Sequence, residues 1–383
     1  MDFGFSKEQH DIRMAAREFA EKEFPEVARE ADIKEEFPFD VWRKASDLGL
    51  IGCFIPEEYN GVGLGITEHC CITEEFWRVD PGCGQCMISA VIGAEVIEMN
   101  GTGEQKEKYL SPLPTGEKIM GIAITEPDAG SDTLAARTSA VKDGDDYVIN
   151  GTKTFITNGD IAEFLVVYCL TRPEAEKPKN RYSMIIVETD RPGYESNKLK
   201  DKLGIRASNT CEVSFREVRV PQENLLGEDG SGFPYLMGFF NRSRITVAAA
   251  AVGLAQGAME MAIRHIKGRR QFGKPLSEFQ VNQFKIAEMG TMIEAARNLT
   301  YKAAGMADNG NIDPGLVAMA KWFCGQVAVR SADEALQMHG GYGYIGDYDI
   351  SRFYRDAKIL EIYEGSKEIE KQIVARHLLK KQF

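Results

Sequence analysis

Apolar and polar residues follow helical spacing at both ends of the chain and strand-like alternation in the middle. In the first third, Ser6 and Gln9 form a capping-box pattern, and apolar residues recur every three or four positions from Ile12 to Ala20. This third is therefore predicted to be helical. Further helical patterns cover residues 39–48, 67–78, 85–99 and 104–110.

The middle of the chain, from about residue 117 to 220, consists of short strand-like runs separated by turn signals such as DGDD, NGD and RPG. The run EVSFREVRV alternates apolar and polar residues, as in a strand with one buried face. No helical pattern of 10–15 residues lies between the runs, which argues against a doubly wound parallel sheet. An antiparallel barrel or sandwich is predicted.

The last third has three long helical patterns over residues 234–268, 278–306 and 313–338. Helices of this length usually form an antiparallel bundle. We therefore predict an α+β multidomain protein. Its parts are an N-terminal helical domain (1–116), a middle β domain (117–225) and a C-terminal helical bundle domain (226–383).

Composition narrows the function classes. The chain has 383 residues, 46 Lys and Arg against 58 Asp and Glu, and a net charge of −12, which argues against unselective nucleic-acid binding. The N-terminus lacks a signal-peptide pattern, and no stretch approaches about 18 uncharged apolar residues, so we expect a soluble cytoplasmic protein. The eight cysteines are expected to be reduced, and no metal site is predicted, because Cys83 and Cys86 have no second ligand pair.

Two segments of the middle region could contact a ligand. TEPDAGSD, residues 125–132, offers small residues and backbone N–H groups for a flat or anionic ligand, or is only a turn between strands. KTFITNG, residues 153–159, could place an aromatic ring and hydroxyls against a ligand, or is an ordinary hairpin ending in Asn158-Gly159.

Three segments of the last third have similar alternatives. RRQFGKPL (269–276) has cations suited to a pyrophosphate, or to compensation of a helix dipole. HGGYGY (339–344) allows backbone approach to a phosphate, or only ends a helix. In IYEGSKEIEKQIVAR (362–376), Glu364 beside Gly365 could act as a general base in a cavity, or only favour a helix N-terminus.

Together with RSRITVAAAAVGLAQ (242–256) and RFYRDAKIL (352–360), these segments resemble the acyl-CoA dehydrogenase family over nearly the whole chain and in the family's order. The resemblance implies a C-terminal four-helix bundle and FAD bound between the β domain and the C-terminal helices. In the middle domain it implies FAD contacts from Ile122, Ile124, Thr125, Gly130, Ser131, Phe155 and Thr157. In the C-terminal domain it implies contacts from Arg269, Gln271, Phe272, Leu276, Phe279, Gln337, Gly340, Gly341, Ser366 and Glu368.

The resemblance also implies an assembly and a reaction. Arg269, Gln271 and Phe272 would reach the FAD of a neighbouring subunit, so at least a homodimer is expected, and the family is usually tetrameric. Glu364 would remove the α-proton of an acyl-CoA thioester while the β-hydrogen leaves as hydride to flavin N5. Its backbone N–H and an FAD hydroxyl would stabilise the thioester oxygen, and the electrons would pass to electron-transferring flavoprotein.

Substrate contacts are implied in the same way. Residues expected at the CoA moiety or beside the base are Ser131, Asn241, Arg244, Arg376, Tyr363 and Gly365. The acyl pocket is expected to contain Cys83, Gly84, Met87, Ile88 and Val91. This apolar set favours a short, branched or alicyclic acyl group.

Departures from relatives leave alternatives. Ser243 stands where one branch of the family has its base, and Gly84 stands where glutaryl-CoA dehydrogenases have an Arg, which disfavours a dicarboxylyl substrate. A glutaryl-type dehydrogenase, an O₂-using oxidase or flavin monooxygenase, and a non-catalytic flavin-binding partner are the alternatives. Retention of Glu364 argues against the last of these.

Overall fold

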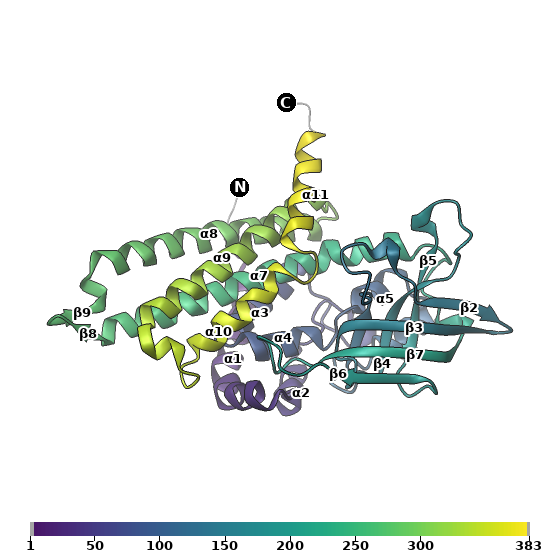
Figure 1. The fold of residues 1–383 in the computed structure, drawn as a ribbon, viewed down its shortest axis with the longest axis horizontal. Coiled ribbons are helices and arrows are strands. Elements are labelled where there is room, and N and C mark those ends of the chain that lie inside the picture. Colours follow the sequence, from purple (N-terminus) through teal and green to yellow (C-terminus); the bar gives the residue numbers. More distant parts are fainter. Residues whose placement is uncertain (1–3, 381–383) are drawn as a thin grey trace.

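The computed structural model describes residues 4–380, and its elements follow the predicted order of helices, sheet and helices (Figure 1). The N-terminal helices are α1 (Lys7–Lys34), α2 (Phe39–Asp47), α3 (Ile66–Val79), α4 (Pro81–Ser89), α5 (Ala94–Asn100) and α6 (Gly103–Tyr109). The prediction of one continuous helix over residues 85–99 is wrong, because α4 ends at Ser89 and α5 begins only at Ala94. Gly93, with φ 99°, occupies the left-handed conformation there, which a glycine adopts without steric cost.

The middle region is a seven-stranded sheet. Its strands are β1 (Met120–Ala123), β2 (Ser139–Asp143), β3 (Asp146–Thr157), β4 (Phe164–Leu170), β5 (Tyr182–Glu188), β6 (Tyr194–Lys198) and β7 (Thr210–Pro221). The order is β1-β4-β2-β3-β7-β6, with β5 also paired to β4. The prediction of a purely antiparallel sheet is wrong. Strand β1 pairs with β4 in parallel, and β2 pairs with β4 in parallel at one residue pair. The β2–β3 hairpin lies between β1 and β4 in sequence, so local alternation could not reveal their direction.

The C-terminal part of the described chain contains five α-helices, a small hairpin and short 3₁₀ helices. The helices are α7 (Gly232–Gly268), α8 (Gln280–Asp308), α9 (Pro314–His339), α10 (Ile350–Ala357) and α11 (Lys367–Leu379). A small hairpin of β8 (Arg270–Gln271) and β9 (Lys274–Pro275) joins α7 to α8. Short 3₁₀ helices occur in all three parts of the described chain. They are η1 (Glu57–Tyr59), η2 (Thr133–Ala135), η3 (Pro178–Asn180), η4 (Gln222–Asn224), η5 (Leu276–Glu278), η6 (Gly340–Tyr344) and η7 (Lys358–Glu361). The domain divisions at 116/117 and 225/226 stay a prediction.

Helix α7 runs the length of the bundle and packs closely on α3. A Cβ at Gly253 would lie 2.1 Å from the carbonyl oxygen of Glu74, and one at Gly257 would lie 2.1 Å from that of Arg78. The small residues of α7 therefore bring two backbones together.

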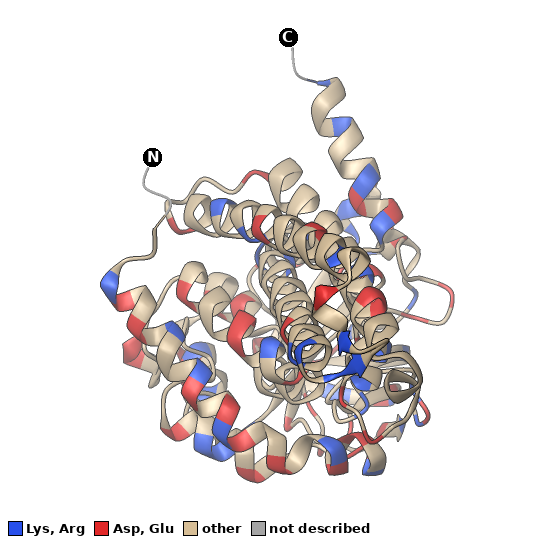
Figure 2. Cartoon of the chain, turned by 90° about the vertical axis from the view of Figure 1, so that its left-hand side faces the viewer, with Lys and Arg blue, Asp and Glu red and all other residues tan. Residues whose placement is uncertain are grey.

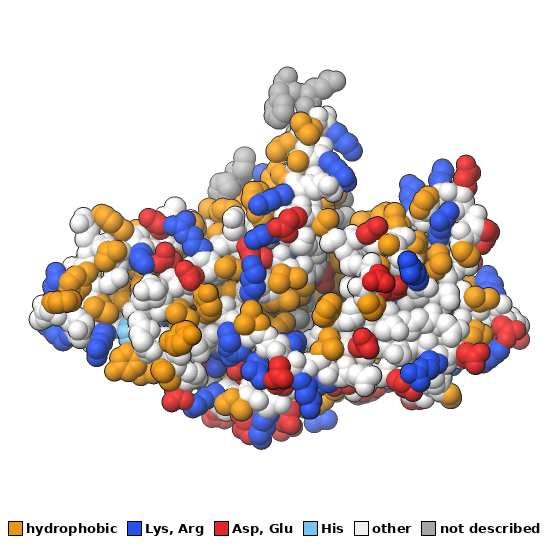
Figure 3. Space-filling model, in the orientation of Figure 1, with side chains coloured by type: hydrophobic (Ala, Val, Ile, Leu, Met, Phe, Trp, Pro, Cys, Tyr) orange, Lys and Arg blue, Asp and Glu red, His pale blue; other side chains and the backbone are white. Residues whose placement is uncertain are grey.

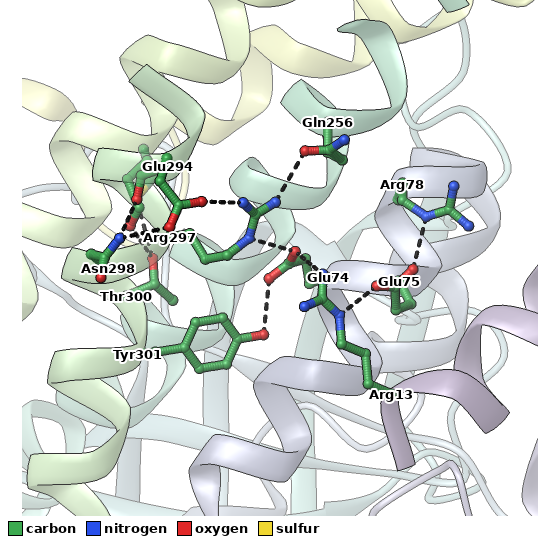
Figure 4. A network of polar contacts seen from close by, with 12 residues as sticks. Arg13, Glu74, Glu75, Arg78, Gln256, Glu294, Arg297, Asn298, Thr300 and Tyr301 are labelled. Atoms are coloured by element: carbon green, nitrogen blue, oxygen red, sulfur yellow. Dashed lines mark hydrogen bonds and ion pairs between the residues drawn. The ribbon is translucent and has the colours of Figure 1, made fainter. Parts of the chain in front are cut away.

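A buried charge network fixes the same junction (Figure 4). The side chains of Glu74 and Glu75 on α3 are fully buried. Glu74 pairs with Arg13 of α1 at 2.7 Å and with Arg297 of α8 at 3.0 Å, and Glu75 pairs with Arg78 at 2.8 Å. The network ties the N-terminal helices to the bundle.

Two stretches, Pro81–Asn100 and Gly232–Gly268, are long and apolar enough by composition to cross a membrane, with mean hydropathy 1.2 and 1.4. In each, 72% of the most apolar window is buried inside the structure, as in a core helix.

Candidate functional site

Glu364 lies on the turn between η7 and α11, in a backbone conformation that its neighbours impose. Its φ is 54°, followed by Gly365 at φ 104°. For a residue with a side chain, a left-handed backbone conformation costs free energy, so surrounding contacts must hold it in place. Such residues often occur at functional sites. Here Arg244 Nε donates to the carbonyl oxygen of Glu364 at 2.9 Å, and Lys321 Nζ donates to that of Gly365.

The carboxyl group of Glu364 is bonded to α7. Ser243 Oγ donates to its Oε2 at 2.6 Å. Burial raises the pKa of Glu364, while the Ser243 hydroxyl and the cations of Arg244 and Lys321 oppose the rise. Part of the side chain remains accessible, because it faces the cavity described next.

That cavity has a volume of about 50 Å³ and lies between α3, α4, α5 and α7. Its walls include Ile88 and Val91 of the predicted acyl pocket, and Tyr363 and Glu364 close one side. The complete lining is Phe54, Thr73, Trp77, Gln85, Ile88, Ser89, Val91, Ile92, Glu95, Phe239, Ser243, Thr246, Val247, Ala250, Tyr363 and Glu364.

Three predicted pocket residues lie elsewhere. Cys83, Gly84 and Met87 are buried and absent from the lining among the described residues. A Cβ at Gly84 would lie 2.9 Å from Trp77 Cδ1 and 3.1 Å from the α3 backbone. Gly84 therefore lets Trp77 reach the cavity wall instead of adding room itself, because its face of α4 points to α3.

Arg244, predicted to contact CoA, lies beside the base. Its side chain is buried, and its Nε lies 3.1 Å from Glu370 Oε1 and donates to the Glu364 carbonyl. It therefore shapes the turn that presents the base. Asn241 is half-buried one turn away, and Arg376 is exposed on α11.

The segments TEPDAGSD and KTFITNG meet at the edge of the sheet. Thr154 N–H donates to the Thr125 carbonyl at 2.9 Å, and buried Lys153 Nζ lies 2.9 Å from Glu126 Oε1. This clamp leaves Phe155 at φ 58°, with 68% of its surface exposed. Near it, Ile124, Thr125 and Thr157 are half-buried, Gly130 and Ser131 are exposed, and Ile122 is buried in β1.

The segments RRQFGKPL and HGGYGY meet at the opposite end of α7. The Arg269 guanidinium lies 5.5 Å from the Tyr342 ring centre, and His265 stacks on His339 at 4.3 Å. Phe272, at the tip of the β8–β9 hairpin, is 93% exposed. The predicted FAD residues at this end are Arg269, Gln271, Phe272, Leu276, Phe279, Gln337, Gly340 and Gly341. From Ser243 to Arg269 the helix extends about 40 Å at 1.5 Å per residue, so the predicted residues form two separate groups (Figure 1).

Comparison with known proteins gives a consistent family. The acyl-CoA dehydrogenase N-terminal, middle and C-terminal domain profiles match residues 6–117, 121–218 and 230–379. The chain is 41% identical over 376 residues to the short-chain specific acyl-CoA dehydrogenase of Clostridium acetobutylicum, covering 98% of this chain and 99% of that protein.

This chain belongs to the acyl-CoA dehydrogenase family. It is 42% identical over 389 residues to the acryloyl-CoA reductase (NADH) of Anaerotignum propionicum, covering 100% of this chain and 97% of that protein. A chain in the solved structure of the electron transferring flavoprotein of Acidaminococcus fermentans matches with TM-score 0.96 and 40% identity, covering 100% of both chains. The predicted fold class and enzyme class, an oxidoreductase acting on CH–CH groups, are confirmed.

FAD is the cofactor of this acyl-CoA dehydrogenase, and the surface fits it. Phe155 exposes an aromatic ring on a strained bulge, where a flat ring system could cover it. A Cβ built on Gly130, Gly340 or Gly341 would meet nothing within 4 Å, so the backbone is open to a ligand there. On the site's other side, Ser366 caps α11 by accepting from Ile369 N–H, and Glu368 is exposed.

Several site residues escaped the sequence analysis. Trp77, Phe239 and Glu95 line the cavity, and Lys321 holds the turn after the base. Trp77 and Phe239 lie in the predicted helices over 67–78 and 234–268, but a helical pattern does not show which cavity a residue borders. Glu95 and Lys321 are charged residues inside helices, and their burial depends on contacts between distant elements.

Proposed function

We propose that this chain dehydrogenates a short, branched or alicyclic acyl-CoA between the α and β carbons, with Glu364 removing the α-proton. The observation that carries the proposal is the Glu364 carboxyl group, bonded to one hydroxyl and facing a cavity with mostly apolar walls. A general base needs a pKa near the operating pH, and burial moves the pKa of Glu364 in that direction. FAD, when bound, would supply the acceptor for the β-hydrogen, which leaves as hydride.

The protein's own groups orient the reaction. Arg244 and Lys321 fix the backbone at Glu364 and Gly365, so the carboxyl group points at the cavity. Within the described part of the chain, no hydrogen bond uses the Glu364 backbone N–H. This supports its predicted use as a donor to the thioester oxygen, where enolate charge develops.

The cavity walls support the acyl class. Trp77, Ile88, Val91 and Phe239 give apolar contact for a compact acyl group. The lining contains no Lys or Arg, which disfavours a dicarboxylyl substrate, because a second carboxylate would lie unpaired beside Glu364. The proposed CoA contacts are Ser131, Asn241, Arg244 and Arg376.

The FAD site is proposed to form between subunits. The exposed hairpin end, with Phe272, Tyr342 and Tyr344, has apolar side chains on its surface (Figure 3) and Lys and Arg residues beside them (Figure 2). A second copy could bring this end to the Phe155 edge of the first. We propose a homo-oligomer of at least two subunits in the cytoplasm.

Electron-transferring flavoprotein is the proposed electron acceptor, supported by the related chain in the Acidaminococcus structure. The test is anaerobic mixing of the FAD-loaded protein with butyryl-, isobutyryl-, isovaleryl-, 2-methylbutyryl-, glutaryl- and cyclohexanecarboxyl-CoA. We expect rapid loss of flavin absorbance with one apolar member, and reoxidation by electron-transferring flavoprotein faster than by air. Fast reoxidation by O₂ alone would favour an oxidase, and no bleaching by any member would contradict the proposed reaction.

A further inference from the structure

A second carboxyl group lines the same cavity as Glu364. Glu95, the second residue of α5, has its Oε2 atom enclosed but without a hydrogen-bond partner among the described residues. The Ser89 hydroxyl, at the end of α4, also lines the cavity and also lacks a partner there. By contrast, Glu98 of the same helix is paired with Arg242 at 3.0 Å. Buried polar atoms are nearly always bonded, so these two need an explanation.

The charges of the cavity determine which form Glu95 takes. Burial raises the pKa of Glu95 to about 7, the Glu364 carboxylate adds to the rise, and Arg242 and local backbone N–H groups oppose it. Glu364 has the Ser243 hydroxyl and two cations to stabilise its anion. Two carboxylates in one poorly solvated cavity do not ionise together easily. Glu364 therefore has more groups that favour its ionised form, whereas the surroundings of Glu95 favour its protonated form, in which the carboxyl group can donate a hydrogen bond.

We propose that Glu95 and Ser89 form a polar subsite that recognises an uncharged oxygen, such as a hydroxyl or keto oxygen, on the acyl group. This inference rests on the proposed function and deepens it by naming a substrate class. The oxygen must be uncharged, because the cavity lining has no cation to pair with a third carboxylate. The apolar walls, among them Trp77, Ile88 and Phe239, would contact the hydrocarbon part of the acyl group.

A purely structural role for Glu95 is the alternative. An acid in the first turn of a helix is favoured by the helix dipole, and Glu95 occupies that position in α5. This role would make Glu95 important for stability and irrelevant to the choice of acyl group.

The test compares isosteric substrates in the FAD-loaded protein. The pairs are 4-hydroxybutanoyl- with pentanoyl-CoA, 5-hydroxypentanoyl- with hexanoyl-CoA, and 6-hydroxyhexanoyl- with heptanoyl-CoA. The measurements are kcat/KM for flavin reduction and the dissociation constants of the matching 2-enoyl-CoA products. In the wild type we expect at least one hydroxyacyl-CoA to have a higher kcat/KM than its alkyl partner, and its product to have a lower dissociation constant. Glu95→Leu should lower that hydroxy-to-alkyl ratio about tenfold, as expected when a buried polar partner is removed.

Three further variants separate recognition from stability. Glu95→Gln keeps an N–H donor and should retain most of the ratio, Ser89→Ala should lower it several-fold, and Glu98→Gln should leave it unchanged. The inference is overturned if alkyl partners win at every length, or if Glu95→Leu and Ser89→Ala lower the melting temperature without changing the ratio. If no acyl-CoA of either series bleaches the wild-type flavin, the proposed function itself fails.

Discussion

The hydrogen bond from Ser243 to Glu364 gives a prediction about pH. Ser243→Ala removes the one hydroxyl that the structure bonds to the carboxylate of the base. That hydrogen bond opposes the rise in the pKa of Glu364, so its loss must raise the pKa further. Since only the ionised base removes a proton, kcat/KM rises with pH through this pKa, and the variant's acid limb must move to higher pH.

The size of the move follows from the bond. A hydrogen bond to a charged group contributes about 1.5–3 kcal/mol net, and about 1.4 kcal/mol corresponds to a factor of ten. Because water can enter the space left by the hydroxyl, we take the lower end of this range. The acid limb should therefore move by about one pH unit, and flavin reduction below it should slow about tenfold.

The assay is anaerobic stopped-flow reduction of the flavin at subsaturating acyl-CoA between pH 5 and 9. Thr246→Val is the matched control, because Thr246 also lines the cavity from α7 and no hydrogen bond joins it to Glu364 in the described structure. Ser243→Thr restores a hydroxyl and should restore most of the profile. An acid limb that stays in place in Ser243→Ala, or moves to lower pH, would refute this reasoning.

Three other predictions concern the frame of the site. Phe155→Ala should change the stability of the FAD-free chain by no more than about 0.5 kcal/mol, because the ring is 68% exposed. It should weaken FAD binding about fivefold in a fluorescence titration, and unchanged affinity would argue against the contact between this ring and FAD. Gly253→Ala should destabilise the protein by about 3 kcal/mol in urea unfolding, because the new Cβ would lie 2.1 Å from the Glu74 carbonyl oxygen. Gly305→Ala is the control and should be neutral or stabilising, because a Cβ there would meet nothing within 4 Å. Glu74→Gln should cost about 3 kcal/mol, because it removes the shared counter-charge of Arg13 and Arg297, and a loss below about 0.5 kcal/mol would show that the network behaves like a surface ion pair.

Local patterns were sufficient for the long elements. The predicted helix over 313–338 is α9 at Pro314–His339, and 278–306 is α8 at Gln280–Asp308. Helical periodicity depends on near neighbours in sequence, and long helices contain many of them. The edge strand β6 (YESNK) and the short strand β2 (SAVKD) do not alternate apolar and polar residues, so no strand pattern predicts them.

The site shows the limit of such patterns. Gly84 was expected in the acyl pocket, but it packs on Trp77, because the crossing of α3 and α4 decides which face meets the cavity. Local patterns also did not predict that Arg244 donates to the Glu364 carbonyl, because the two residues lie 120 positions apart in sequence. The meeting of Thr125 with Thr154 likewise depends on a sheet whose strand order is not local.

The most direct test of the account is the reaction of Glu364→Gln beside the wild type, both loaded with FAD. An acyl-CoA that bleaches the wild-type flavin is presented with hydrogen or deuterium at the α carbon. We predict that deuterium slows the wild type several-fold, and that Glu364→Gln binds the same acyl-CoA but bleaches at least about 10²-fold more slowly. Bleaching of Glu364→Gln at the wild-type rate would contradict the assignment of Glu364 as the base.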